Sequence, residues 1–276
     1  EVFLLPNDMH PPYSDQWTIG LRQKFGDWLG SISYANTQGH NGMSWIFGTL
    51  PPDAPFNDRF GLWVGIPGYG IVLKATDVRE TEYDAIFLTL DKPFTASSRW
   101  GVNIAYTYGE GKQEGTTDEG TAFSFDYRYT SDFFKFPANG DERHGIVASG
   151  TVGLPWGFYV SSVISLGSGV PYTYTDCSLG FDRCVTHFNG FRPEKEDFII
   201  PDAFAYRNVD LRLEWEAPVI AERVRLTLIG EAFNVFDFAN YNGFDGFIPP
   251  GGNPNFGKPN SAFNARRYQV GLQVGF

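Results

Sequence analysis

The chain ends on the segment RRYQVGLQVGF, residues 266–276, in which apolar side chains alternate with polar or small ones. The apolar set is Tyr268, Val270, Leu272, Val274 and Phe276. A period of two is the period of a β-strand, because successive side chains point to opposite faces. The segment therefore predicts a strand with one apolar face and one polar face. A strand over a soluble core shows the same pattern, so one strand alone does not identify the environment.

The same alternation recurs along the chain and predicts nine strands. They are Trp17–Phe25, Trp28–Asn36, Tyr83–Asp91, Trp100–Tyr108, about Gly145–Leu154, Phe158–Leu166, Asn208–Trp215, about Val224–Phe233 and Tyr268–Phe276. In the seventh strand, the face carrying Asp210, Arg212 and Glu214 cannot line a dry core. Repetition of this pattern favours an all-β antiparallel transmembrane β-barrel over a soluble β-sandwich or propeller, because a barrel has lipid on one side and water on the other.

The connections between these strands alternate strictly in length. Four are short, at Gly26-Asp27, Lys92–Arg99, Pro155–Gly157 and Ala217–Arg223, and four are long, at residues 37–82, 109–143, 167–207 and 234–266. Loops of that length are unusual in a compact soluble domain. Outer-membrane barrels have short periplasmic turns and long external loops. The pattern therefore predicts the outer membrane of a Gram-negative bacterium, with the long loops extracellular and the carboxy-terminus periplasmic.

The composition limits the classes of binding partner and of enzymatic chemistry that we expect for this chain. Among 276 residues, 17% are aromatic, 32 are glycine and 18 are proline, which is typical neither of a helical protein nor of a disordered one. A net charge of −11 without a basic cluster argues against nucleic acid as a partner. The partner that the barrel interpretation predicts is the lipid of the outer membrane. The four histidines are far apart and no G-x-S-x-G motif occurs, so we expect no enzyme, catalytic residue, metal or cofactor.

The number of strands predicts that residues 1–276 are the carboxy-terminal portion of a larger barrel. Bacterial single-chain barrels have an even number of strands, whereas nine are visible here. The segment Phe3–Ser14 contains three prolines and reads as the tail of a further loop. On this interpretation, the first strands of the barrel are absent from the sequence, and the family resemblance described next implies that a plug domain is absent as well.

A set of motifs in a fixed order resembles a known family. The motifs are YDAIFLTLDK (83–92), NIAYTY (103–108), YRNVDLR (206–212, containing N-x-D-x-R), EAFNVFD (231–237), FGKP (256–259) and RRYQ (266–269) with the final Phe276. Together they resemble the carboxy-terminal part of the β-barrel of a TonB-dependent outer-membrane receptor, closest to the Oar-like subgroup. Asp237 departs from that pattern, which more often has Asn at this position.

The resemblance implies a barrel of roughly 22 strands, of which these would be the last nine. It also implies TonB-dependent active transport of a scarce external ligand, with an amino-terminal plug domain and TonB as partners. The ligand and its binding residues stay unknown. Two other functions remain open. One is a small diffusion porin complete in itself, with a further strand from Phe3–Ser14 or Ala122–Tyr129, and the other is an outer-membrane structural or adhesion protein.

Two cysteines, Cys177 and Cys184, lie in one long loop with six residues between them. In an exported protein this pair predicts a disulfide. Neighbouring Asp176, Ser178 and Asp182 suggest that the pair is exposed. A zinc site that adds His187, or two unrelated buried thiols, are the alternatives.

The barrel interpretation assigns each strand residue to a face. The polar side chains expected to face the lumen are Arg22, Asn103, Asp210, Arg212, Glu214, Arg225, Glu231 and Gln269. They would either pair with one another and with a plug as polar filling, or line a ligand path. The side chains expected to face lipid include Val102, Ile104, Val209, Leu211, Val270 and Leu272.

Loop residues offer two weaker hypotheses. The aromatic residues Trp45, Trp63, Tyr69, Tyr172, Tyr174 and Phe188 could stack on a sugar or an aromatic siderophore, or pack the loops against themselves. Oxygen-bearing side chains at Asp237, Asn240, Asn242 and Asp245 could hold calcium, although such residues are also ordinary turn formers.

Overall fold

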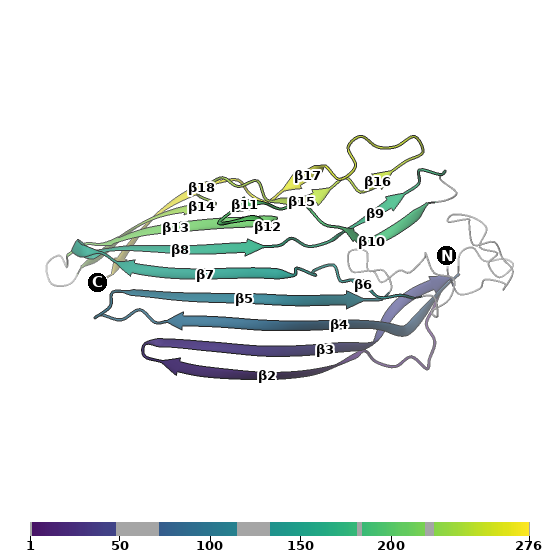
Figure 1. Ribbon diagram of the computed structural model, residues 1–276, viewed down its shortest axis with the longest axis horizontal. Coiled ribbons are helices and arrows are strands. Elements are labelled where there is room, and N and C mark those ends of the chain that lie inside the picture. The colour runs from purple at the N-terminus through teal and green to yellow at the C-terminus, as the bar shows by residue number, and fades with distance from the viewer. Residues whose placement is uncertain (1, 48–71, 115–132, 181–183, 219–223, 276) are drawn as a thin grey trace.

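A computed structural model describes residues 2–47, 72–114, 133–180, 184–218 and 224–275. Within these ranges, nine long antiparallel strands form one sheet in the order β18-β14-β13-β8-β7-β5-β4-β3-β2 (Figure 1). The strands are β2 (Tyr13–Phe25), β3 (Trp28–Phe47), β4 (Val72–Lys92), β5 (Trp100–Gln113), β7 (His144–Gly153), β8 (Phe158–Gly167), β13 (Tyr206–Glu216), β14 (Arg225–Phe233) and β18 (Arg267–Gly275). The predicted all-β antiparallel fold is confirmed.

The strands extend further on the long-loop side than the sequence predicts. β3 continues to Phe47, β4 begins at Val72 and β5 continues to Gln113, so parts of the expected loops 37–82 and 109–143 are strand. The pairing of β3 with β4 shifts between Gly39 and Ser44 but does not stop. Backbone pairing does not itself require apolar alternation, so the strands continue beyond the segments that the alternation marks. The expected boundaries at Asn36 and Tyr83 were therefore wrong.

Short strands fill the long connections. They are β1 (Val2–Leu4), β6 (Phe136–Pro137), β9 (Tyr172–Asp176), β10 (Val185–Phe191), β11 (Glu196–Phe198), β12 (Ile200–Phe204), β15 (Tyr241–Phe244), β16 (Phe247–Ile248) and β17 (Pro259–Ala262). β1 pairs with β4 in parallel, and β16 pairs with β9 in parallel. The segment Phe3–Ser14 therefore supplies most of β1, which joins the main sheet only alongside β4, and the start of β2. It adds no further strand at either edge of the sheet. Ala122–Tyr129 lies outside the described residues.

The sheet is open in the part of the chain that the structure describes. β2 pairs with β3 and β18 pairs with β14, and these two strands are the opposite edges of the sheet (Figure 1). On the short-connection side, β2 and β3 are joined by a two-residue turn at Gly26-Asp27, and β7 and β8 are joined by a short turn. The second turn contains η2 (Pro155–Gly157), in which Trp156 and Gly157 both have positive φ.

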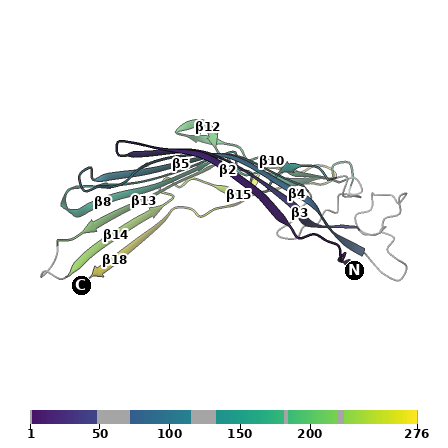
Figure 2. The same ribbon diagram turned by 90° about the horizontal axis from the view of Figure 1, so that it is seen from below.

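The two faces of the curved sheet differ in chemistry. Leu211 and Leu272 are exposed on the apolar face, so neither packs in a dry interior. Figure 2 shows that the sheet is arched and that β12 lies on its convex side. β12 pairs with β11, and Glu196 of β11 contacts Arg207 of β13. Arg207 and Leu211 lie on the same face of β13, because residues an even number apart on a strand share a face. The apolar face is therefore convex and the polar face concave. No helix among the described residues has the length and apolar character to span a membrane.

Candidate functional site

The eight polar residues predicted to face a lumen all lie on one face of the sheet. Residues paired directly across antiparallel strands share a face, and so do residues two apart along a strand. One continuous row consists of Gln269, Glu231, Arg212, Ser161, Thr151 and Gly101. Asn103 lies two residues from Gly101, and its partner Asp91 lies two residues from Thr89. Thr89 pairs with Ser31, which pairs with Arg22, and so the row reaches β2.

Hydrogen bonds connect the charged end of this concave face. Arg212 Nη2 lies 2.5 Å from Glu214 Oε2, and Arg212 Nη1 lies 3.4 Å from Glu231 Oε1. Arg212 therefore joins a carboxylate on its own strand to one on the neighbouring strand. Pairing of opposite charges across strands is the arrangement expected of a polar wall that satisfies its own charges.

The middle of the concave face carries small polar side chains. Ser31 contacts Thr89 at 2.5 Å, and Thr151 contacts Ser161 at 2.9 Å. Farther along, Asn103 Nδ2 donates to Asp91 Oδ1 at 3.3 Å. Short hydroxyl side chains leave space above the sheet and still offer hydrogen-bonding groups. This part of the wall can therefore accept another polar surface at close range.

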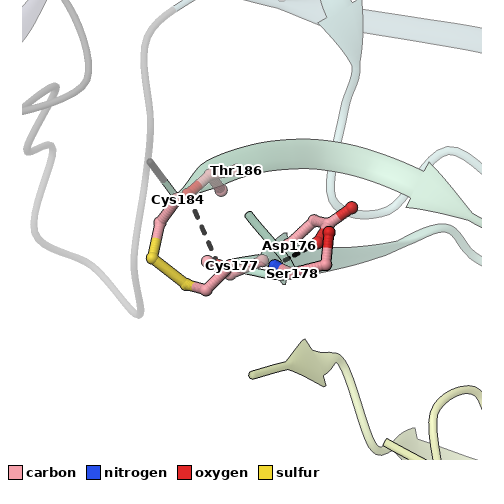
Figure 3. Close-up of a disulfide and its surroundings, with 6 residues drawn as sticks. Asp176, Cys177, Ser178, Cys184 and Thr186 are labelled. Atoms are coloured by element: carbon pink, nitrogen blue, oxygen red, sulfur yellow. Dashed lines mark hydrogen bonds between the residues drawn. A yellow bond between two sulfur atoms is a disulfide. The ribbon is translucent and has the colours of Figure 1, made fainter. Parts of the chain in front are cut away.

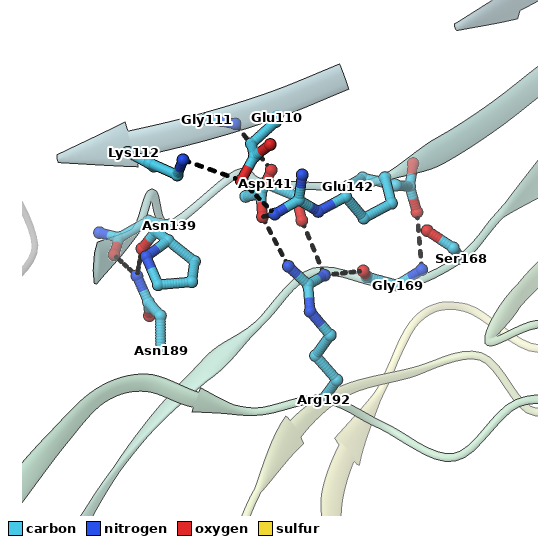
Figure 4. Close-up of polar contacts among 12 residues, drawn as sticks. Glu110, Gly111, Lys112, Asn139, Asp141, Glu142, Ser168, Gly169, Asn189 and Arg192 are labelled. Atoms are coloured by element: carbon cyan, nitrogen blue, oxygen red, sulfur yellow. Dashed lines mark hydrogen bonds and ion pairs between the residues drawn. The ribbon is translucent and has the colours of Figure 1, made fainter. Parts of the chain in front are cut away.

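A charged network ties the segments at the long-loop end together (Figure 4). The Asp141 side chain is fully buried. Its Oδ2 lies 2.5 Å from Arg192 Nη2, and its Oδ1 accepts the Gly111 amide at 2.8 Å. Arg143 Nη2 lies 3.4 Å from the same carboxylate and 3.0 Å from Glu110 Oε1. Three separate segments, namely β5, the residues before β7 and the residue after β10, are thus held by one buried carboxylate. No sequence motif pointed to this network.

Glu142 borders this network and lies over β8. Its Oε1 accepts the Gly169 amide at 3.0 Å. A Cβ atom at Gly167 would collide with the same carboxyl group, so a glycine is needed there for Glu142 to lie across the strand. Burial raises the pKa of Glu142, and the Gly169 amide and Arg192 only partly oppose that rise.

A cavity of about 420 Å³ lies among the loop strands. Its aromatic lining is Phe191, Tyr241, Phe244 and Phe256, and its charged lining is Glu194, Glu196 and Lys258. A concavity of this volume, with four aromatic rings and three charged side chains, has the size and character of a small-molecule pocket. Phe256 and Lys258 drew attention in the sequence only as part of the FGKP motif. The other lining residues were not singled out, because they come from separate loop segments without local periodicity.

The aromatic residues proposed from the sequence mostly pack against other loop residues. The Tyr172 ring meets Phe244 with centroids 4.8 Å apart, and the Tyr174 ring stacks on His187 at 4.4 Å. Phe188 stacks on Phe136 at 5.1 Å. These contacts support the interpretation that the loops pack against themselves. Trp45 meets Phe3, whereas Trp63 and Tyr69 lie outside the described residues.

The structure contains the disulfide between Cys177 and Cys184, with Cα atoms 4.1 Å apart (Figure 3). The bond uses both sulfurs, so the zinc alternative with His187 does not hold. The expectation of an exposed pair was wrong for Cys177, which is buried. Its amide donates to Ile248 of β16 at 2.7 Å, and this contact places a second loop against the bridge.

The oxygen-bearing residues of the last loop act as backbone partners. Asn240 accepts the Arg207 amide at 2.8 Å and donates to the Arg207 carbonyl at 2.6 Å, in the way that a neighbouring strand would. Asp237 accepts the Arg266 amide, and Asp245 accepts from Asn253. Within the described ranges, no three acidic, histidine or cysteine side chains lie close enough to hold a metal ion. The contacts thus favour turn formation over calcium binding.

Residues 1–176 match the family model of the outer membrane beta barrel domain. The chain belongs to this family. Its place is therefore the outer membrane, with the apolar convex face toward lipid. No curated protein shows significant similarity to the chain.

Two solved structures share the fold of this outer membrane beta barrel domain at low sequence identity. The outer membrane transporter YddB from Escherichia coli superimposes with a TM-score of 0.61 at 14% identity, over 99% of this chain and 33% of that one. The ferric-catecholate import receptor Fiu from E. coli K12 gives a TM-score of 0.50 at 11% identity, over 98% and 28%. The chain therefore spans about a third of the length of these two proteins.

Proposed function

We propose that the chain is the carboxy-terminal part of the barrel of a TonB-dependent receptor of the Oar-like subgroup, which takes up a scarce external ligand without catalysis. The observation that carries the proposal is the open sheet, with β2 and β18 as unpaired edges among the described strands. Lipid cannot hydrogen-bond exposed backbone amides, so a membrane sheet has to close. Closure with strands of a larger barrel accounts for both edges at once.

The concave face supports the same proposal. A TonB-dependent receptor holds a plug domain inside its barrel, and the plug needs hydrogen-bonding partners on the barrel wall. The hydroxyl groups around Ser31, Thr89 and Thr151 and the charges around Arg212 and Glu231 supply them. On this proposal, these polar residues contact the plug, and the plug contacts TonB from the periplasm.

An external ligand would first meet the segments at the long-loop end, which we place outside the cell. The cavity lined by Phe191, Tyr241 and Phe256 is the candidate ligand contact there. The network around Asp141 holds the neighbouring segments in place, and a fixed pocket loses less entropy on binding than a mobile one.

Depletion of the growth medium tests the transport role. Wild-type cells, cells without this gene and cells without TonB are incubated with a mixture of siderophores, cobalamins and oligosaccharides, and mass spectrometry follows each compound. We expect at least one compound to be depleted by the wild type and by neither mutant. A compound whose uptake needs this gene but not TonB would favour the diffusion porin. No change for any compound would favour the structural or adhesion role.

A further inference from the structure

The hairpin formed by β11 and β12 has an apolar tip. Phe198 pairs with Ile200, so Ile199 is the centre of the turn. Ile199 has a φ of +61°, where a β-branched residue is a genuine outlier and Gly or Asn is usual. Ile199 is nevertheless 72% exposed and Ile200 is 53% exposed. The fold thus presents apolar side chains at a position where a soluble turn would have small polar ones. The positive φ of Ile199 is a strained backbone conformation, and strain of this kind clusters at functional sites.

This hairpin is fixed to the convex face of the sheet. Glu196 Oε2 lies 2.6 Å from Arg207 Nη2, and the Arg207 guanidinium also lies 4.8 Å from the centre of the Phe238 ring. Arg207 shares its face of β13 with Leu211, which belongs to the lipid-facing surface. The hairpin therefore lies outside the barrel wall and away from the lumen, as the position of β12 in Figure 2 shows.

The exposure of β13 locates the hairpin relative to the lipid. Along the convex face, Val209 is 5% exposed, whereas Leu211 and Leu213 are 39% and 50% exposed. Protein therefore covers this face down to Val209, and the open apolar surface begins at Leu211, about 7 Å further along the strand. The contact at Arg207 places the base of the hairpin just beyond the margin of this open surface.

The tip belongs to a wider apolar patch. The Phe198 ring meets Phe236 at 6.0 Å and Phe238 at 4.8 Å, and Phe236 is itself 60% exposed. We define the rim patch as Ile199, Ile200 and Phe236. Contiguous exposed apolar side chains of this kind mark an interaction surface.

We propose that the rim patch inserts into the outer leaflet of the membrane, at the boundary of headgroups and acyl chains. The proposal rests on the convex face contacting lipid and does not depend on TonB-dependent transport. Continuity with the lipid-facing surface at Leu211 favours lipid over a protein partner. Two of the acidic side chains near the tip have partners inside the protein: Glu196 pairs with Arg207, and Asp197 accepts the Asp202 amide at 2.9 Å. Asp202 itself is exposed and lies two residues beyond Ile200. The hairpin thereby anchors the segment between β10 and β13 to the membrane surface.

Nitroxide labels in the full-length protein test this proposal in phosphatidylethanolamine–phosphatidylglycerol vesicles. Labels are placed at Ile199→Cys and Ile200→Cys, with Leu211→Cys as the lipid control and Asn253→Cys as the loop control. Power saturation then compares collisions with oxygen, which partitions into lipid, and with a water-soluble nickel chelate. We expect the ratio of oxygen to nickel collisions at both tip sites to be severalfold above that at Asn253.

Each other outcome overturns the proposal in a distinct way. A tip ratio equal to that at Asn253, with Leu211 still reporting lipid, would show that the hairpin stands in water. A tip shielded from both reagents would indicate a protein partner. If Leu211 also reported water, the membrane assignment of the whole convex face would be wrong.

A second variant separates insertion from folding of the turn. Asn tolerates the left-handed backbone of Ile199, so Ile199→Asn keeps the hairpin and removes the apolar side chain. With the label at Ile200→Cys, this change should lower the oxygen-to-nickel ratio toward the value at Asn253. The matched change Asp202→Asn, also at a positive φ, should leave it unchanged. An unchanged ratio in Ile199→Asn would contradict insertion through the tip.

Discussion

Arg192 lies 2.5 Å from the carboxylate of Asp141, and this ion pair joins the segment after β10 to the segment before β7 (Figure 4). The Asp141 side chain is fully buried, whereas that of Arg192 is about one-third exposed. A buried carboxylate is stable only when its charge is compensated. The pair is therefore a structural clamp of the loop end, distinct from the surface ion pairs around it.

Replacing Asp141 with Ala should loosen the loop end without unfolding the barrel. The change removes the carboxylate that accepts from Arg192 Nη2 and from the Gly111 amide, while Arg192 Nη1 keeps its two backbone carbonyl acceptors. We expect a local cost of about 2–3 kcal/mol. Hydrogen exchange should accelerate at Gly111 and in β10, with β7 and β8 unchanged. As the control, Lys112→Gln removes an exposed ion pair with Glu110 and should have little effect. Equal acceleration throughout the barrel would contradict a local clamp.

The local structure around the half-buried Glu142 should be more stable at low pH, although the hydrogen bond from the Gly169 amide itself favours the ionised carboxylate. Because burial raises the pKa of Glu142 above its usual 4.5, the folded state binds this proton more tightly than the unfolded state. Its stabilisation is full below pH 4.5 and is lost as the pH rises through the raised pKa. After correction for intrinsic rates, protection of the Gly169 amide should be greater at about pH 5 than at about pH 8. Glu142→Gln, which keeps the acceptor oxygen, should abolish that difference, and a variant that kept it would exclude Glu142 as the source.

The two faces should respond oppositely to a new charge. Leu213→Arg places a cation on the lipid-facing surface, deeper than the margin at Leu211, and should destabilise the folded barrel by about 2 kcal/mol. Ser149→Arg places the same side chain on the concave face, opposite Asn103, and should be mild. Reversible unfolding in phospholipid vesicles measures both. Comparable losses for the two variants would contradict the assignment of faces.

Removing the disulfide should affect one loop. A bridge that closes so short a segment stabilises it by at most about 2–3 kcal/mol. In Cys177→Ser with Cys184→Ser, exchange should accelerate in β9 and β10, while the melting of the barrel should stay within experimental error. A large fall in barrel melting temperature would show that the bridge stabilises more than its own loop.

The long strands could be predicted from the sequence because contact with lipid requires apolar and polar side chains to alternate along them. Alternation is forced wherever one face meets lipid, so Leu211 and Leu213 could be assigned without a structure. The same alternation assigned Val209 to lipid, which was wrong, because protein covers that face at Val209 and leaves it 5% exposed. Beyond Asn36 the strict alternation of apolar and polar residues stops. For this reason β3 was predicted to end at Asn36, although its pairing continues to Phe47.

The loop end could not be predicted for a different reason. Asp141 and Arg192 are 51 residues apart and meet only because β7, β8 and the following strands return to the same edge. Neither residue lies in a motif, and each alone is an ordinary surface type. Ile199 is likewise not a residue type that favours turns, so the tight turn at the hairpin tip could not be predicted from the sequence.

Cryo-electron microscopy of the protein purified from its own outer membrane tests the central claim most directly. The account predicts a closed barrel in which Trp17–Phe25 and Tyr268–Val274 each hydrogen-bond to strands outside residues 1–276. It also predicts a plug domain against the concave face near Ser31, Thr151 and Arg212. A barrel closed by direct pairing of β2 with β18, or formed by residues 1–276 alone, would contradict it.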